Sequence, residues 1–207
     1  MSSLFWISDS FRKHLAMKVH DLATDVYKVA LVTSALVCPE TVWTSGAKTV
    51  GQVVVPTVRN GHRYLVTVGG SDTTEPSWPT TADDTVGSAP QYTEYGGDLC
   101  AHDIWADVSG AEVAAGDGYT TGGVALASKT LTQVYRSTVW DAADPEWSAL
   151  TKDFRYAFFY QVGTNNGVVN GIVGYALCDD TFVDKEIVGS DYLLRLNASG
   201  IVSLTKD

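Results

Sequence analysis

Short runs of β-branched and aromatic residues, separated by turn-forming segments, recur along most of the 207-residue chain. Asn-Gly pairs at 60–61 and 166–167 supply the positive φ angles that tight hairpins need, and 197–200, between the runs at 192–196 and 201–204, is a third hairpin signal. Many short strands at this spacing are typical of a sandwich or barrel. We therefore expect a mainly β fold, an Ig-like or jelly-roll-like β sandwich. The runs are 28–34, 53–55, 64–68, 124–135, 154–162, 168–177, 192–196 and 201–204.

One segment near the N-terminus has helical periodicity instead. Phe11, Leu15, Val19 and Leu22 fall on one face of a helix over residues 8–22, and a serine at its start can cap it. An apolar stripe of this kind usually packs on a core, and it is also suited to docking on a neighbouring subunit. The sequence therefore predicts one N-terminal helix beside the sandwich.

The stretch at 39–98 differs in composition from its flanks. It is rich in Thr, Gly and Tyr and holds five of the six prolines. The strand before it and the segments after it look like parts of one domain. We therefore predict a β-sandwich domain made of residues 1–38 and 99–207, interrupted by a small β module at 39–98.

Cys38 and Cys100 stand at the two ends of that module. The ends of an insertion must lie close together, which places two thiols within reach of a disulfide. In the chain-entropy model such a crosslink stabilises by about 3–4 kcal/mol. The alternative is that both are small buried hydrophobic side chains, as we expect for Cys178.

The charge of the chain excludes some classes of partner. The net charge is −10, and Lys and Arg form no cluster. Nucleic-acid binding needs a basic surface, so it is not expected. No apolar run approaches the ~20 residues that span a bilayer, and the N-terminus has no signal-peptide pattern. We expect a protein made in a cytoplasm, or used in a particle assembled there, without membrane insertion.

The low share of charged residues, 18%, is open to two interpretations. Partners can cover part of the surface, or Thr, Ser, Gly and Tyr can take the place of charges on exposed strands.

No constellation of catalytic residues stands out. The histidines, at 14, 20, 62 and 102, have no metal-ligand spacing, and we expect surface or packing roles for them. The glycine-rich stretch at 116–123 lacks the lysine of a phosphate-binding loop, so its glycines are expected in tight turns. We therefore expect no enzymatic activity, no metal and no cofactor.

Five segments, taken in order, resemble a family of small virion proteins of tailed phages. They are Lys-Val-Ala-Leu-Val-Thr-Ser at 28–34, the Gly-Tyr-Thr-Thr-Gly-Gly stretch ending at 123, Asp-Pro-Glu-Trp at 144–147 with the aromatic strand at 154–160, Ile-Val-Gly-Tyr at 172–175, and 194–204. The resemblance covers residues 10–37 and 100–207. It implies a structural component of the particle without enzymatic activity.

The inserted stretch resembles a different family, a small module of phage tail and surface proteins that is similar to chitin-binding carbohydrate-binding domains. Gly-Gln-Val-Val-Val-Pro-Thr-Val-Arg-Asn-Gly-His-Arg-Tyr at 51–64 and Glu-Pro-Ser-Trp-Pro-Thr-Thr at 75–81 carry it. An aromatic residue of that pattern is missing before Gly51, and Tyr92 stands where a tryptophan is expected.

Exposed aromatic rings on a small β platform can stack on sugar rings. The candidates are Trp43, Tyr64, Trp78, Tyr92 and Tyr95. A domain this small also needs aromatics for its core, which we favour for Tyr64 and Trp78, whereas Trp43 and Tyr95 are expected to be exposed.

Together these features predict a structural protein of a tailed-phage virion, of the capsid decoration or cement type, that displays the module. Its partners would be other virion proteins and cell-surface glycans, and it would occur as a homo-oligomer or as repeated copies on the particle. The alternatives are a tail, baseplate or collar subunit with an adhesion or spacer role, and a glycan-acting hydrolase, which would need two carboxylates facing each other across a cleft.

Overall fold

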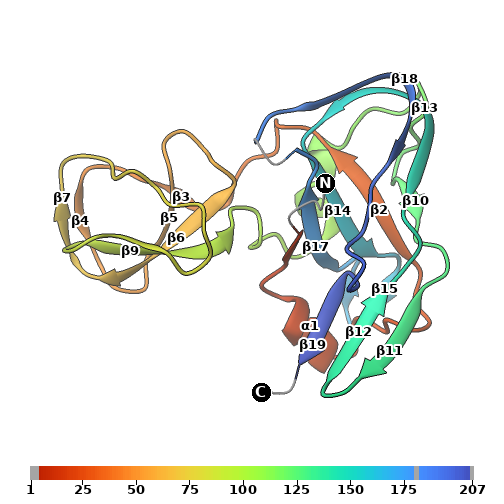
Figure 1. Ribbon diagram of the computed structural model, residues 1–207, viewed down its shortest axis with the longest axis horizontal. Helices are drawn as coiled ribbons and strands as arrows, with labels where there is room; N and C mark the ends of the chain where they lie inside the picture. Colours follow the sequence, from red (N-terminus) through yellow and green to blue (C-terminus); the bar gives the residue numbers. More distant parts are fainter. Residues whose placement is uncertain (1–4, 180–181, 206–207) are drawn as a thin grey trace. The chain divides into compact units, whose positions relative to one another are not determined.

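The computed structural model describes residues 5–179 and 182–205 (Figure 1). The chain forms two compact units: Met1–Leu36 together with His102–Asp207, and Val37–Ala101. We call the first the sandwich unit and the second the inserted unit. The inserted unit contains the whole of the 39–98 stretch.

The sandwich unit is built on a five-stranded antiparallel sheet with the order β1-β17-β14-β2-β10. All side chains of β14 and β17 are buried, which explains why these strands read as continuous apolar runs rather than as alternating ones. On one face of the sheet, Trp105 stacks on Tyr160 with ring centroids 4.6 Å apart. The strands are β1 (Phe5–Ile7), β2 (Tyr27–Val32), β10 (Val124–Ala125), β14 (Tyr156–Gln161) and β17 (Ile172–Leu177).

The other face packs against a second layer. Ala157, Phe159 and Val173 of the sheet share one buried cluster with Trp140 and Trp147 of that layer. The layer is a three-stranded sheet, β11-β12-β19, and a ribbon of β13 with β18. The mainly β, sandwich-like architecture predicted from the sequence is therefore confirmed. The strands are β11 (Thr130–Val134), β12 (Ser137–Asp141), β13 (Glu146–Phe154), β18 (Lys185–Leu193) and β19 (Val202–Thr205).

The predicted helix forms over only part of its range. Helix α1 spans Phe11–Ala16, and Lys18 adopts a left-handed conformation with φ of 54°. The chain turns there, and the backbone N–H of Val19 donates to the carbonyl of His14. Val19 and Leu22 are still buried, so the apolar stripe reaches the core without continuing as helix.

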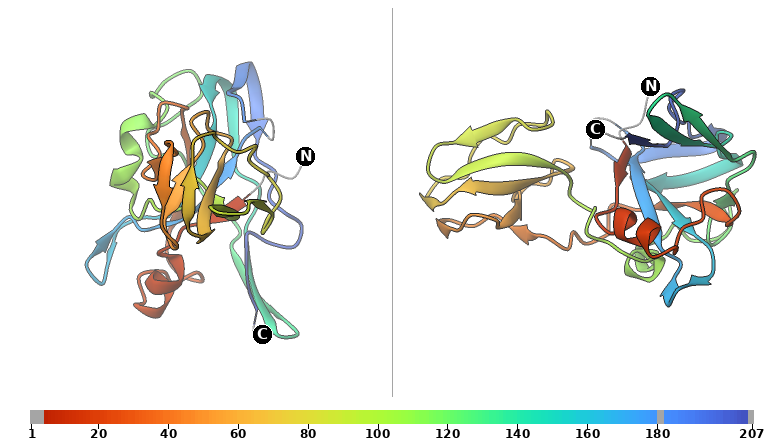
Figure 2. Two further views of the ribbon diagram at one scale, coloured as in Figure 1. Left: turned by 90° about the vertical axis from the view of Figure 1, so that its left-hand side faces the viewer. Right: turned by 90° about the horizontal axis from the view of Figure 1, so that it is seen from below.

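One of the hairpins predicted from turn residues forms as expected, and another does not. Strands β15 (Thr164–Asn165) and β16 (Val168–Val169) form the predicted hairpin, with positive φ at both intervening residues. This hairpin and that of β11 with β12 extend from the body of the sandwich unit (Figure 2). The hairpin predicted at 197–200 is wrong, because β19 pairs with β12 and not with β18.

The inserted unit has its own five-stranded sheet, with the order β3-β5-β6-β9-β8, and a short pair, β4-β7. Its core is a separate cluster. The strands are β3 (Thr41–Val42), β4 (Gly46–Lys48), β5 (Val53–Val55), β6 (His62–Val68), β7 (Gly70–Asp72), β8 (Thr85–Gly87) and β9 (Gln91–Gly97).

Candidate functional site

The aromatic residues proposed for sugar binding are mostly core residues of the inserted unit. Tyr64 and Tyr92 are fully buried, and Trp78 packs against them with ring centroids 4.4 Å from Tyr64 and 5.0 Å from Tyr92. Trp43, expected to be exposed, is only 8% exposed, so that expectation is wrong. Tyr95 is 52% exposed, as expected.

Hydrogen bonds to their polar atoms hold the side chains of Trp43, Tyr92 and Tyr64 in place. The indole N–H of Trp43 donates to the hydroxyl of Tyr92 (3.2 Å), which donates to Asp72 (2.5 Å). The hydroxyl of Tyr64 donates to the carbonyl of Pro79 (2.5 Å). Burial raises the pKa of both tyrosines to about 12. A unit this small uses its aromatics as core, so the buried rings of Trp43, Tyr64 and Tyr92 cannot offer a stacking face, and Trp78 is half-buried against that core.

Tyr95 is the exposed exception, yet one face of its ring is already covered. The guanidinium carbon of Arg63 lies 4.9 Å from the ring centroid, and Arg63 also forms an ion pair with Glu40 at 2.9 Å. A single partly covered ring does not make a sugar-binding platform.

Buried ion pairs are the other feature of the inserted unit. Asp98 is fully buried and lies 2.6 Å from the guanidinium of Arg59. His62 lies 2.9 Å from Glu94, and both are buried. His62 is therefore a buried, hydrogen-bonded side chain, in keeping with the packing role that was one of the two expected for it.

All three cysteines are free thiols, so of the two alternatives for Cys38 and Cys100 the disulfide is not formed. The Cys38 thiol instead donates to the carbonyl of Asp98 at 2.9 Å. Burial raises the pKa of Cys38 to about 11, which keeps the thiol protonated and unreactive. Cys100 is buried and Cys178 half-buried, in keeping with the alternative of small hydrophobic side chains.

Two histidines of the sandwich unit are buried together. His14 and His20 are 1% and 4% exposed, with ring centroids 5.4 Å apart. Both ring nitrogens of His20 lack a hydrogen bond of normal geometry among the described protein atoms. Burial lowers the pKa of His20 to about 4 and also lowers that of His14. Both are therefore neutral at pH 7.

The glycine-rich stretch at 116–123 forms turns, as expected. Gly123 has φ of 69°, and a Cβ there would lie 1.9 Å from the carbonyl oxygen of Val29. Tyr119 within the stretch donates to Glu112 (2.8 Å) and accepts the N–H of Leu31 (3.1 Å). Its glycines thus let the backbone lie directly against β2.

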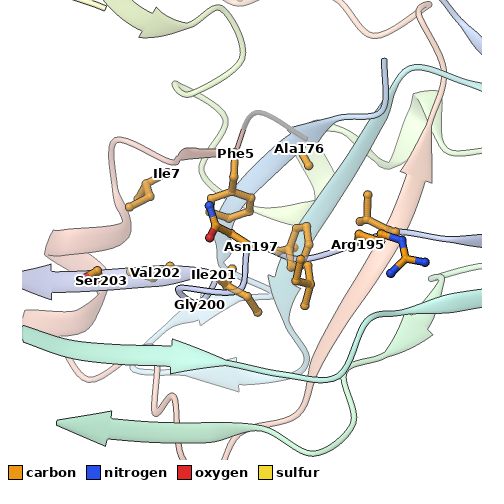
Figure 3. A pocket seen from close by; sticks show the side chains of 12 residues that line it. Phe5, Ile7, Ala176, Arg195, Asn197, Gly200, Ile201, Val202 and Ser203 are labelled. Carbon is orange, nitrogen blue, oxygen red and sulfur yellow. The ribbon is translucent and has the colours of Figure 1, made fainter. Parts of the chain in front are cut away.

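Sequence reasoning missed a groove of about 440 Å³ in the sandwich unit. Phe5, Ile7 and Ala176 line one side of it, and Leu196, Ile201 and Val202 line the other. In Figure 3, Phe5 and Ile7 lie on the opposite side of the groove from Ile201 and Val202, with Arg195 at one end. The groove is mainly apolar, and none of its described lining residues is acidic. We call it the β1–β19 groove.

The groove lies between two open sheet edges. Strand β1 is the outer strand of the five-stranded sheet, and β19 is the outer strand of the three-stranded sheet. Edge strands present unpaired backbone groups that favour pairing with another chain. A local pattern along the sequence cannot reveal this feature, because the two edges come from opposite ends of the chain.

Some kinds of site are not found in the described part of the chain. No group of three or more His, Cys, Asp or Glu residues there is arranged to hold a metal ion. The same residues include no helix with the length and apolar character needed to cross a membrane.

No family model, curated protein or solved structure matches this chain. The interpretation of the site therefore depends on its own residues and geometry.

Proposed function

We propose that this chain is a non-catalytic structural protein of a tailed-phage virion, of the capsid decoration or cement type, assembled onto the particle in the host cytoplasm. The observation that carries the proposal is the β1–β19 groove, an apolar surface bounded by two open strand edges. Surfaces of this kind serve binding to other proteins. The resemblance of the flanking segments to small virion proteins supplies the kind of particle.

The chemistry of the groove supports a binding role over a hydrolytic one. Glycoside hydrolysis needs two carboxyl groups about 5–10 Å apart across a cleft. Of the described residues that line the groove, Arg195 alone is charged, and polar side chains such as Asn197 and Ser203 also line it. Nothing in this set can act as the acid and base pair.

The inserted unit has a separate part in this function. Its own core and buried ion pairs make it a self-contained body carried by the sandwich unit. The burial of Trp43, Tyr64 and Tyr92, and the packing of half-buried Trp78 against that core, favour a structural role for these rings over sugar stacking. The inserted unit is then a spacer or a display body on the particle.

Electron cryo-microscopy of the purified particle tests the proposal. Density for both units at regular capsid positions is the expected result. Density confined to the neck, baseplate or tail would assign the protein to the alternative role of a tail, baseplate or collar subunit. Absence of the protein from purified particles, checked by mass spectrometry of the same sample, would refute the proposal.

A further inference from the structure

The β1 edge of the groove is ready to accept another strand. The N–H of Ser8 donates to the carbonyl of Val173 at 2.9 Å, and the register pairs Ile7 with Gly174 and Phe5 with Ala176. In an antiparallel ladder, alternate residues direct their backbone groups to the neighbouring strand. Because Ser8 bonds to β17, the backbone groups of Phe5 and Ile7 point away from it, to the open side.

The opposite wall of the groove is held in place by hydrogen bonds. The N–H of Leu196 donates to Asp144 (2.8 Å), and the N–H of Leu194 donates to the carbonyl of Pro145 (3.0 Å). The N–H of Ile201 donates to the carbonyl of Trp140 at 2.8 Å. A wall fixed in this way loses little conformational freedom when an occupant binds.

Apolar side chains remain exposed to solvent along this edge. Ile7 is 38% exposed, and Phe5, which meets Phe159 edge-to-face at 5.1 Å, is half-buried. Leu196 on the facing wall is also half-buried. An extended segment lying between the walls would cover these groups with every second side chain, as one face of a strand does.

The positive charge of Arg195 at one end of the groove indicates which charge a binding partner carries there. Arg195 is exposed and lines the groove at one end. Among the described residues that line the groove, it is the one that carries a charge. In a chain with net charge −10, an exposed arginine beside an apolar groove is complementary to a carboxylate on a partner.

We propose that the β1–β19 groove receives an extended apolar segment of another virion protein, which adds to β1 as a strand and presents a carboxylate to Arg195. This inference rests on the proposed function, and it names the surface and the partner chemistry of that function. The net charge of −10 disfavours close association between copies of this chain, so the occupant is a different protein.

Two pairs of variants test the backbone and charge parts separately. Ile7→Pro removes the outward N–H at an edge position where proline is compatible with the β17 ladder, and Ile7→Val keeps that N–H. Arg195→Glu reverses the charge, and Arg195→Lys keeps it. Arg136→Glu, in the turn between β11 and β12 and outside the groove, is the control for net charge.

The measurement is the amount of each purified variant that co-sediments with particles produced without the protein, quantified by mass spectrometry. Circular dichroism and thermal melting establish that each variant is folded. Binding of Ile7→Pro and Arg195→Glu is expected to fall about tenfold or more relative to wild type. Ile7→Val, Arg195→Lys and Arg136→Glu are expected to bind within about twofold of wild type.

The outcomes separate this inference from the proposed function. If wild-type protein does not bind the particles, the proposed function fails. If it binds and folded Ile7→Pro and Arg195→Glu bind equally well, the groove assignment is wrong and the function stands. Self-association of the purified protein that Ile7→Pro abolishes would identify a second copy as the occupant. A small amphipathic molecule retained by the wild type in native mass spectrometry, and lost in Arg195→Glu, would likewise overturn the proposal.

Discussion

The sandwich unit and the inserted unit differ in how they bury polar groups. In the sandwich unit a large aromatic and aliphatic core surrounds His20 and Tyr27, whose polar side-chain atoms have no hydrogen bond of normal geometry among the described residues. In the inserted unit the core cluster is small, and buried charged groups have partners, as Asp98 pairs with Arg59 and Glu94 is hydrogen-bonded to His62.

This difference follows from size. A small unit buries a lower fraction of its surface and has less apolar area to stabilise it, so each buried charge must be compensated locally. A larger core gains enough from apolar burial to tolerate the loss from an uncompensated neutral group. Damage to packing should therefore affect mainly the sandwich unit, and damage to charge pairing mainly the inserted unit.

The largest effect is expected from Trp140→Ala. Trp140 is fully buried, its ring centroid lies 4.9 Å from that of Tyr27, and its N–H donates to the carbonyl of Leu22 at 3.0 Å. Removing it should lower the free energy of unfolding of the sandwich unit by about 3–5 kcal/mol. Hydrogen exchange with mass spectrometry reports each unit separately, and protection should fall in the sandwich unit alone.

Val188→Ala is the matched control for Trp140→Ala, because Val188 lies on β18 and is 67% exposed. Its effect should stay within about 0.5 kcal/mol. An equal loss of protection in both units after Trp140→Ala would contradict the view that each unit has its own core.

A somewhat smaller effect is expected from Arg59→Met. The change leaves the buried carboxylate of Asp98 without this cation, which should destabilise the inserted unit by about 3 kcal/mol. Urea denaturation followed by hydrogen exchange measures it. Arg59→Lys should cost less, and adding Asp98→Asn to Arg59→Met should restore part of the loss. If the double variant is no more stable than Arg59→Met, the buried charge is not the cause.

The smallest effect is expected from mild acid, and it should affect the sandwich unit. The pKa of His20 is about 4 in the folded protein and 6.5 without burial, so the unfolded chain binds the proton first as the pH falls. The stabilisation is complete above pH 6.5 and is lost progressively toward about pH 4, by about 1 kcal/mol between pH 6.5 and about 5.5.

Thermal melting across this pH range measures the acid effect, and His20→Phe is the control. Phenylalanine fills a similar space beside Phe11, whose ring centroid lies 5.4 Å from that of His20, and it does not titrate. The variant should lose most of the dependence on pH between 6.5 and about 5.5. An unchanged pH dependence would show that another group is responsible.

The parts of the fold that depend on local pattern could be predicted from the sequence. Apolar and β-branched runs located β2, β5, β6, β14 and β17, and Asn166-Gly167 specified a hairpin, because these signals act between near neighbours. The strands β9, β12 and β13 and most of β18 were not predicted. The choice of partner for β19 could not be predicted, since Asn197 to Gly200 gives a turn whether the following strand pairs with β18 or with β12.

The candidate site was less predictable, for two physical reasons. An aromatic residue on a short strand fits a core and a binding surface equally well. The sequence therefore predicted an exposed Trp43, whereas its side chain is buried. The β1–β19 groove depends on which strands are left at the edges of two sheets, and that is decided only when the whole topology is formed. Phe5 and Ile7 give no signal of their own beyond being apolar.

The hydrogen bond from Cys38 to the carbonyl of Asp98 bears on which changes of the inserted unit the sandwich unit can accept. It holds the entry and the exit of the inserted unit side by side, so the chain leaves and returns at nearly one point. Any small domain with adjacent termini meets the same requirement. The inserted unit is therefore an exchangeable cassette, which recombination or an engineer can replace while the sandwich and its groove stay intact.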